Sequence, residues 1–122
     1  MTTMTPSKPA YKRGDIILVV FPDSNLRTGK LRPALIIQAD NLRTGLAQVI
    51  VAMITSNTAR ADHPSRVTIA LAADEGRKSG LLTDSVVMTD NLATIVGREI
   101  NRVIGSLPMT NVDAALRHTL GL

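Results

Sequence analysis

The sequence predicts a mainly β protein: a small, strongly curved sheet or open barrel of about five to seven short strands, with one C-terminal helix. Short apolar runs recur along the chain, and polar segments that contain glycine or proline separate them. One segment after Pro108 has helical spacing instead. The residues that share one face of this segment are Val112, Ala115, Leu116, Thr119 and Leu120.

The expected strands begin and end at turn signals. The first run, Ile16–Phe21, is apolar throughout, whereas Ser65–Leu71 alternates in part, as a half-buried strand does. We expect a charged turn at residues 74–80, and a helix capped by Thr110 with Asp113 in capping-box spacing. The expected strands are residues 16–21, 31–38, 48–56, 65–71, 84–88, 94–96 and 102–107.

Composition limits the possible functions. The chain has 122 residues, of which 44% are hydrophobic, so we expect one domain at 11–122 after a flexible tail at 1–10. Tyr11 and Phe21 are the only aromatic residues, so base stacking on an aromatic platform is not the expected mode of nucleic-acid binding. The net charge of +4 favours a polyanionic partner.

The chain has no cysteine, which excludes disulfides, thiolate catalysis and cysteine-based zinc sites. The acidic residues are scattered without metal-ligand spacing, so we expect neither a metal nor another cofactor. No apolar run approaches the roughly 20 residues that span a bilayer, and Met1–Pro9 lacks a signal-peptide core. We therefore expect a soluble, cytoplasmic protein.

Residues 31–38 and 48–56 form the most informative pair of segments, because they are expected to fold as a hairpin around Asp40–Leu46. Such a hairpin would place Arg32 beside Thr55 at the open end of an otherwise apolar pair of strands. The expected cross-strand pairs are Gln38 with Val49, Ile36 with Val51, Ala34 with Met53, and Arg32 with Thr55.

Arg32 and Thr55 are the candidate catalytic residues. Pro33 stiffens the start of the strand, so the preceding Arg32 is held on a rigid element. A planar guanidinium suits phosphate and could stabilise charge on a pentacoordinate phosphorus. The threonine hydroxyl is not a general base at neutral pH, so its expected role is to position a phosphate or a ribose hydroxyl.

Several flanking residues are candidates for substrate binding. Ser56 follows Thr55 directly, and cations in or beside the neighbouring loops could contact backbone phosphates. Asp90 could orient Arg32, act as a base or cap a turn, of which the turn is favoured. His63 and His118 do not form a convincing acid–base pair in the sequence. The flanking cations are Arg27, Lys30, Arg60 and Arg66.

These motifs, in this order, resemble the MazF/PemK toxins of bacterial toxin–antitoxin systems, and the match runs from about Tyr11 to the end of the chain. Arg-Pro at the start of one strand and Thr-Ser at the end of the next are fairly specific as a pair. The segments that carry the resemblance are Lys12–Ile16, Arg32–Ile37, Ile54–Ser56, Asp84–Val87 with Asp90 and Thr94, and Ile104–Leu107.

The resemblance implies an SH3-like small barrel of the CcdB/MazF type with a C-terminal helix, and a homodimer. It also implies sequence-specific, metal-independent cleavage of single-stranded RNA, such as mRNA, with Arg32 and Thr55 at the positions of the family's arginine and threonine. The expected products carry a 2′,3′-cyclic phosphate and a 5′-hydroxyl. A cognate acidic antitoxin would occupy the same basic groove.

Two departures from the family pattern keep other functions open. Arg27 and Thr28 stand where many relatives carry Glu-Gln, and Met88 stands where some PemK-type members carry an arginine. One alternative is therefore a catalytically degraded module that binds RNA or antitoxin. The other is a non-enzymatic poison of DNA gyrase similar to CcdB, although the C-terminal Leu120-Gly121-Leu122 lacks the aromatic residue of that family's tail.

Overall fold

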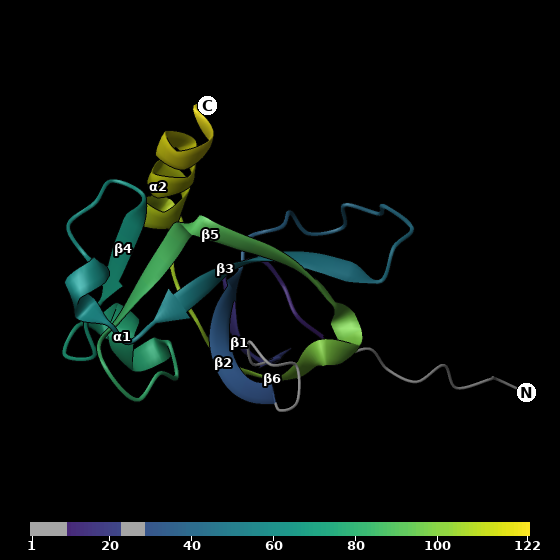
Figure 1. Cartoon of the computed structure of the whole chain (residues 1–122), viewed down its shortest axis with the longest axis horizontal. Coiled ribbons are helices and arrows are strands. Elements are labelled where there is room, and N and C mark those ends of the chain that lie inside the picture. Colours follow the sequence, from purple (N-terminus) through teal and green to yellow (C-terminus); the bar gives the residue numbers. More distant parts are fainter. Residues whose placement is uncertain (1–9, 23–28) are drawn as a thin grey trace, which may run out of the picture.

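A computed structural model describes residues 10–22 and 29–122 of the chain. Its six strands form one antiparallel sheet in the order β4-β5-β3-β2-β1-β6, with the helix α2 packed beside β4 and β5 (Figure 1). The strands are β1 (Asp15–Pro22), β2 (Gly29–Ile36), β3 (Gln48–Thr55), β4 (Arg66–Ile69), β5 (Ser85–Val96) and β6 (Ile100–Ser106). The helices are η1 (Thr58–Arg60), α1 (Asp74–Lys78), η2 (Gly97–Glu99) and α2 (Thr110–Leu120).

This architecture confirms the predicted mainly β fold with its C-terminal helix. The sheet curves strongly but does not close, since β4 and β6 are its two edges. Of the predicted tail at residues 1–10, residues 1–9 lie outside the described residues. Among those that are described, no helix has the length and apolar character that crossing a membrane would require.

Three local predictions were wrong. The runs at 84–88 and 94–96 belong to one long strand, β5, rather than to two. The expected charged turn at 74–80 contains the short helix α1, whose acidic residues lie in its first turn and basic residues in its last, as the helix dipole favours. Thr110 is the first residue of α2 rather than its cap, and Asp113 pairs with Arg13 at 2.6 Å instead of forming a capping box.

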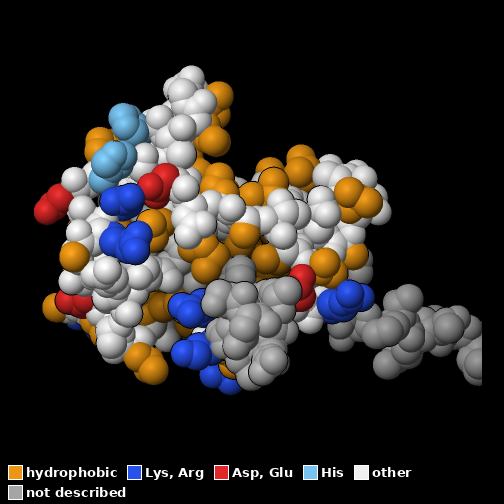
Figure 2. Space-filling model, in the orientation of Figure 1, with side chains coloured by type: hydrophobic (Ala, Val, Ile, Leu, Met, Phe, Trp, Pro, Cys, Tyr) orange, Lys and Arg blue, Asp and Glu red, His pale blue; other side chains and the backbone are white. Residues whose placement is uncertain are grey.

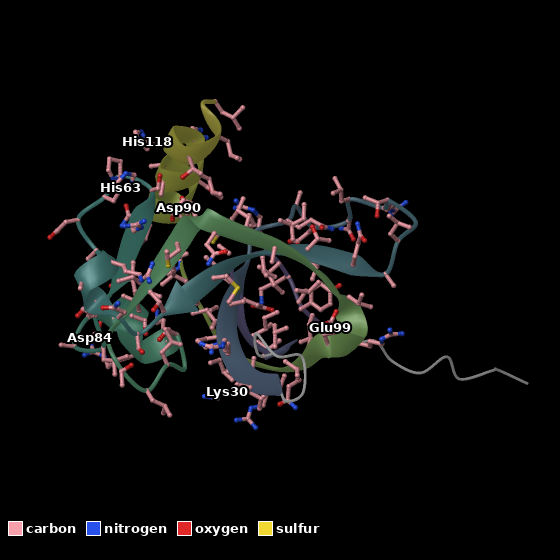
Figure 3. All side chains as sticks on the ribbon, viewed as in Figure 1. Lys30, His63, Asp84, Asp90, Glu99 and His118 are labelled. Carbon is pink, nitrogen blue, oxygen red and sulfur yellow. The ribbon has the colours of Figure 1, made fainter. Side chains whose placement is uncertain are left out.

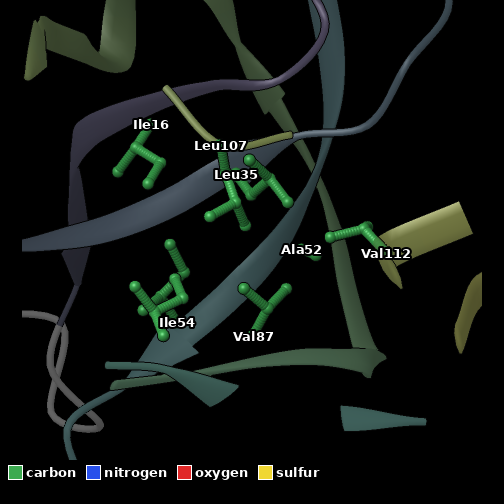
Figure 4. Close-up of a cluster of buried hydrophobic side chains, with 8 residues drawn as sticks. Ile16, Leu35, Ala52, Ile54, Val87, Leu107 and Val112 are labelled. Carbon is green, nitrogen blue, oxygen red and sulfur yellow. The ribbon is translucent and has the colours of Figure 1, made fainter. Parts of the chain in front are cut away.

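The central strands bury side chains on both faces of the curved sheet, which explains their continuous apolar runs. Successive residues of a strand point to opposite faces, and here each face contacts its own core. The first core contains Ile16, Leu35, Ala52, Ile54, Ile69, Val87, Leu107 and Val112, the last of these from α2 (Figure 4). The second core contains Ile17, Val19, Ala34, Ile36, Val49, Val51, Ile95 and Ile100.

Thr89 joins β5 to α2 and to the segment before β4. Its side chain is fully buried, and its hydroxyl lies 2.6 Å from the Ser65 carbonyl oxygen, 2.7 Å from the Thr119 hydroxyl and 3.3 Å from the Ala115 carbonyl oxygen. A hydroxyl has one proton to donate, so Thr89 donates to a carbonyl and accepts from Thr119.

We expect Thr89→Val to lower the free energy of unfolding by about 1–3 kcal/mol, because it removes buried hydrogen bonds without changing the side-chain shape. Urea denaturation measures the difference. Thr68→Val is the matched control on the exposed face of β4 and should change stability by less than about 0.5 kcal/mol. Equal unfolding midpoints for the wild type and Thr89→Val would contradict this account.

Candidate functional site

The hairpin of β2 and β3 pairs in the predicted register, with Ala34 opposite Met53 and Ile36 opposite Val51. Arg32 lies two residues before Ala34, and Thr55 lies two residues after Met53, so the alternation of a strand places both on the same face. Both side chains line one pocket of about 400 Å³. The fold therefore brings together the two residues that the sequence predicted as a pair.

The two outermost predicted pairs are not part of the strand ladder. Arg32 is paired on its other side, with Val19 of β1, and the following Pro33 has no amide proton to donate towards β3. At the closed end, the amides of Ile37 and Gln38 both donate to the Ile50 carbonyl, at 3.2 and 3.3 Å. Gln38 is therefore not a regular partner of Val49, and Arg32 and Thr55 meet through the pocket rather than through backbone pairing.

The pocket presents cations and hydroxyls beside several apolar side chains. Arg32 and Arg60 supply two guanidinium groups, and Thr55 and Ser56 supply two hydroxyls. Within residues 10–22 and 29–122, neither arginine forms an ion pair with a carboxylate, whereas three others do. The pocket is thus suited to an anion such as a phosphodiester. Its remaining lining residues are Leu31, Pro33, Met53, Ile54, Met88 and Asn91.

The Thr55 hydroxyl is oriented by the turn that follows it. The Asn57 amide donates to Thr55 Oγ1 at 3.1 Å, and the Asn57 side chain accepts from the Ala59 amide at 3.2 Å. One lone pair of the hydroxyl oxygen is therefore already used. Since a hydroxyl also carries one donor, Thr55 can still donate its proton to a group that enters the pocket.

A bulge in β5 separates Asp90 from this pocket. Met53 of β3 pairs with Met88, but the next residue, Ala52, pairs with Leu92, so residues 89–91 have no partner on β3. Figure 1 shows the resulting corner in β5 beside α2. Asn91 lines the pocket, whereas Asp90 binds Arg66, with the Arg66 Nη2 to Asp90 Oδ2 distance at 2.8 Å.

The favoured interpretation of Asp90 as a turn cap was therefore wrong, because Asp90 lies inside a strand. An orienting contact from Asp90 to Arg32 is not formed either, since its carboxylate faces Arg66. Asn91 was missed because Asp90 and Asn91 resemble a turn in the sequence, whereas they lie in a bulge within one strand.

The other predicted binding residues divide into three groups. Ser56 lines the pocket, as expected. Lys30 and Arg66 do not line it: Lys30 is exposed near the start of β2, far from Asp90 in Figure 3, and Arg66 lies on β4. Arg27 lies outside the described residues.

The two histidines lie close together, which the sequence did not indicate. The rings of His63 and His118 meet edge to face with their centres 6.0 Å apart (Figure 3). Figure 2 shows them side by side, with basic and acidic side chains immediately below them. Neither histidine lines the pocket that contains Arg32 and Thr55, so the geometry gives them no contact with that site.

Two further observations concern possible ligands. No group of three or more metal-ligating side chains is found within the described part of the chain. A second pocket, of about 500 Å³, lies under the loop at residues 37–47, at the opposite end of the hairpin. It contains Arg43 but does not combine two arginines with a strand-end hydroxyl, as the Arg32 pocket does.

Comparison with known proteins gives the family. Residues 12–120 match the family described as PemK-like, MazF-like toxin of type II toxin–antitoxin system. The chain belongs to this family. It is similar to Endoribonuclease MazF6 of Mycobacterium tuberculosis (strain ATCC 25618 / H37Rv), with 36% identity over 105 residues that cover 83% of this chain and 88% of that protein.

Solved structures of MazF/PemK-family toxins share the fold. An endoribonuclease in complex with its cognate antitoxin from Mycobacterial species superposes with a TM-score of 0.71 and 22% identity, covering 93% of this chain and 97% of that one. The Mycobacterium tuberculosis toxin MazF-mt6 gives a TM-score of 0.64 with 26% identity, covering 87% of this chain and 97% of that one. The open six-stranded sheet with a C-terminal helix is thus the fold of these neighbours.

In this MazF/PemK-family chain, the ion pair between Arg66 and Asp90 at the β5 corner changes the pKa of the Asp90 carboxyl group. The hydrogen bond from Arg66 lowers the pKa of Asp90 below its ordinary value, against the opposing effect of burial. Because the pKa of Asp90 is lower in the folded state, the pair stabilises the fold at pH values above the unfolded-state pKa of roughly 3.9. This stabilisation is lost as the pH falls through the lower pKa that Asp90 has in the folded protein.

We expect Arg66→Gln to raise the pKa of Asp90 towards its ordinary value, because the guanidinium that stabilises the carboxylate is removed. An NMR titration of the Asp90 side-chain carboxyl measures the change. Arg77→Gln, which breaks the exposed pair of Arg77 with Asp74 on α1, is the control and should leave Asp90 unchanged. The same Asp90 titration curve with and without the Arg66 guanidinium would contradict the assigned cause.

Proposed function

We propose that this chain is a toxin endoribonuclease that cleaves single-stranded RNA at specific sequences without a metal ion. The observation that carries the proposal is that Arg32 and Thr55 line the same pocket. The membership of the chain in the MazF/PemK family supports it, as does its 36% identity to a protein named as an endoribonuclease.

The proposed reaction is a transfer within the RNA strand. The ribose 2′-hydroxyl attacks the adjacent phosphorus, a bond from the 2′-oxygen to phosphorus forms, and the bond from phosphorus to the 5′-oxygen breaks. The attacking hydroxyl loses its proton to solvent water, and the leaving 5′-oxygen gains a proton from the Arg32 guanidinium, which solvent then protonates again. The products are a 2′,3′-cyclic phosphate and a 5′-hydroxyl, and no water is consumed in this step.

Arg32 stabilises the negative charge that develops on the phosphorane oxygens and can supply a proton to the leaving oxygen. Its place on a strand paired to β1 fixes its backbone, so little reorganisation is needed as charge develops. Thr55 holds a phosphate oxygen through the proton that its contact with Asn57 leaves available. This catalysis depends on positioning and electrostatics, since no described side chain in the pocket is an ordinary general base.

The other predicted binding residues are assigned roles according to where they lie relative to the pocket. Ser56 contacts the phosphate group beside the scissile one, and Lys30 attracts the polyanion to this side of the sheet. Arg27, which precedes β2 in the sequence, is proposed to bind RNA as well. The enzyme works as a homodimer in the cytoplasm, and a cognate acidic antitoxin inhibits it by covering the basic pocket.

We expect Arg32→Ala to reduce RNA cleavage by at least about 10²-fold, because it removes the cation that stabilises the transition state. The measurement maps the 5′ ends of a long mixed RNA after incubation with pure protein in EDTA. The wild type should cut at fixed sites and leave 5′-hydroxyl ends.

Arg98→Ala is the matched control, since Arg98 is an exposed arginine in η2, beyond the far end of β5. It should cleave like the wild type. Full cleavage by a folded Arg32→Ala preparation would refute the site. Binding of diverse RNA by the wild type without any cut would instead support the degraded binding module.

A further inference from the structure

Arg60 reaches the pocket from a very short turn that starts three residues after Thr55. The turn is the 3₁₀ helix η1, and Arg60 is its last residue. Its start is fixed by Asn57, which contacts both Thr55 and the Ala59 amide. This single turn has only two backbone hydrogen bonds of its own, from the Arg60 amide to the Asn57 carbonyl and from the Ala61 amide to the Thr58 carbonyl, both at 3.1 Å. A contact from outside the turn therefore adds substantially to what holds its far end.

Arg66 supplies the contact at that far end. Its Nη1 donates to the Arg60 carbonyl oxygen at 3.1 Å, while its Nη2 and Nε donate to the two carboxylate oxygens of Asp90 at 2.8 and 3.5 Å. One guanidinium thus connects η1 to the β5 corner. We name this arrangement, formed by Arg66, Asp90 and the Arg60 carbonyl, the Arg66 bridge.

The Arg66 bridge lies beside the pocket rather than in it. Neither Arg66 nor Asp90 lines the pocket, whereas Arg60 does. The exposed fractions of the Arg66 and Asp90 side chains are 23% and 34%. Ion pairs this close to water contribute little to global stability, so the main consequence of the bridge is local: it fixes the residue that carries a second guanidinium into the pocket.

We propose that Arg60 binds the phosphate adjacent to the scissile one, and that Arg66 and Asp90 are positioning residues that act through Arg60 without touching RNA. This inference rests on the proposed function, because it assumes that the pocket of Arg32 and Thr55 receives an RNA strand. It replaces the expectation that Arg66 and Asp90 contact the substrate directly. The bulge at residues 89–91 is then functional, since it turns Asp90 towards Arg66 and Asn91 towards the pocket.

The test measures the affinity for a short, mixed-sequence 2′-O-methyl RNA over a range of salt concentrations. This probe keeps the phosphates but cannot be cleaved, so the result does not depend on catalysis. Each phosphate contact to a single strand contributes about 0.7 to the slope of log affinity against log salt. Arg60→Ala should weaken binding and reduce the steepness of that slope by about this amount, whereas Arg60→Lys should keep the slope.

Asp90→Asn tests the bridge. It should weaken binding in the wild-type background and cause no further loss in the Arg60→Ala background, because a positioning residue has no effect once the group that it positions is gone. Asp74→Asn is the matched control, because Asp74 is another described aspartate whose arginine partner also donates to a backbone carbonyl. It should leave affinity and slope unchanged.

Three results would overturn the proposal: an unchanged salt slope in Arg60→Ala, an equal loss from Asp90→Asn in both backgrounds, or no salt-dependent binding by the wild type. Failure of the proposed function is a separate result, because it requires intact RNA after incubation with the wild type. A wild type that binds with the expected slopes but leaves RNA uncut would support the bridge and refute the nuclease.

Discussion

The site depends on the register between β2 and β3. Ala34 faces Met53, and from that pair outwards the alternation of the strands decides which side chains share a face. A slip of one residue would exchange the two cores and move Arg32 and Thr55 apart. Because both faces of these strands are packed in separate cores, such a slip would move each apolar side chain into a core whose shape fits a different set of side chains. The packing of the aliphatic core therefore fixes the position of the polar site.

The β5 corner is the second constraint, because it separates two surfaces with different chemistry. On one side lie Arg32, Thr55, Arg60 and Asn91, which share a pocket. On the other side lie Arg66, Asp90 and the paired histidines, where positive and negative charges compensate each other. Thr89, at the corner itself, is buried and bonded to α2 and to the segment before β4. The C-terminal helix thus stabilises the bend that separates the two surfaces.

The sequence was sufficient for the parts of the fold in which local pattern and packing agree. The hairpin register followed from apolar runs of matching length, and this was enough to predict Arg32 near Thr55. The sequence was not sufficient at the bulge, where β5 continues through residues that resemble a turn. There Asp90 contacts Arg66, and neither caps a turn nor contacts Arg32. It could not predict the contact between His63 and His118 either, because that contact joins a loop to a helix distant in the chain. Arg60 was recognised only as one of several loop cations, since its place in the pocket depends on the turn at η1.

The central claim is that one phosphodiester is held between the Arg32 guanidinium and the Thr55 hydroxyl. The most direct test is a crystal structure of the protein with a 2′-O-methyl RNA that it binds but cannot cut. The account predicts a phosphate with an oxygen within about 2.7–3.2 Å of an Arg32 nitrogen and a second oxygen at a similar distance from Thr55 Oγ1. RNA bound elsewhere, for example beside His118 and Arg66 with the Arg32 pocket free of phosphate, would contradict it.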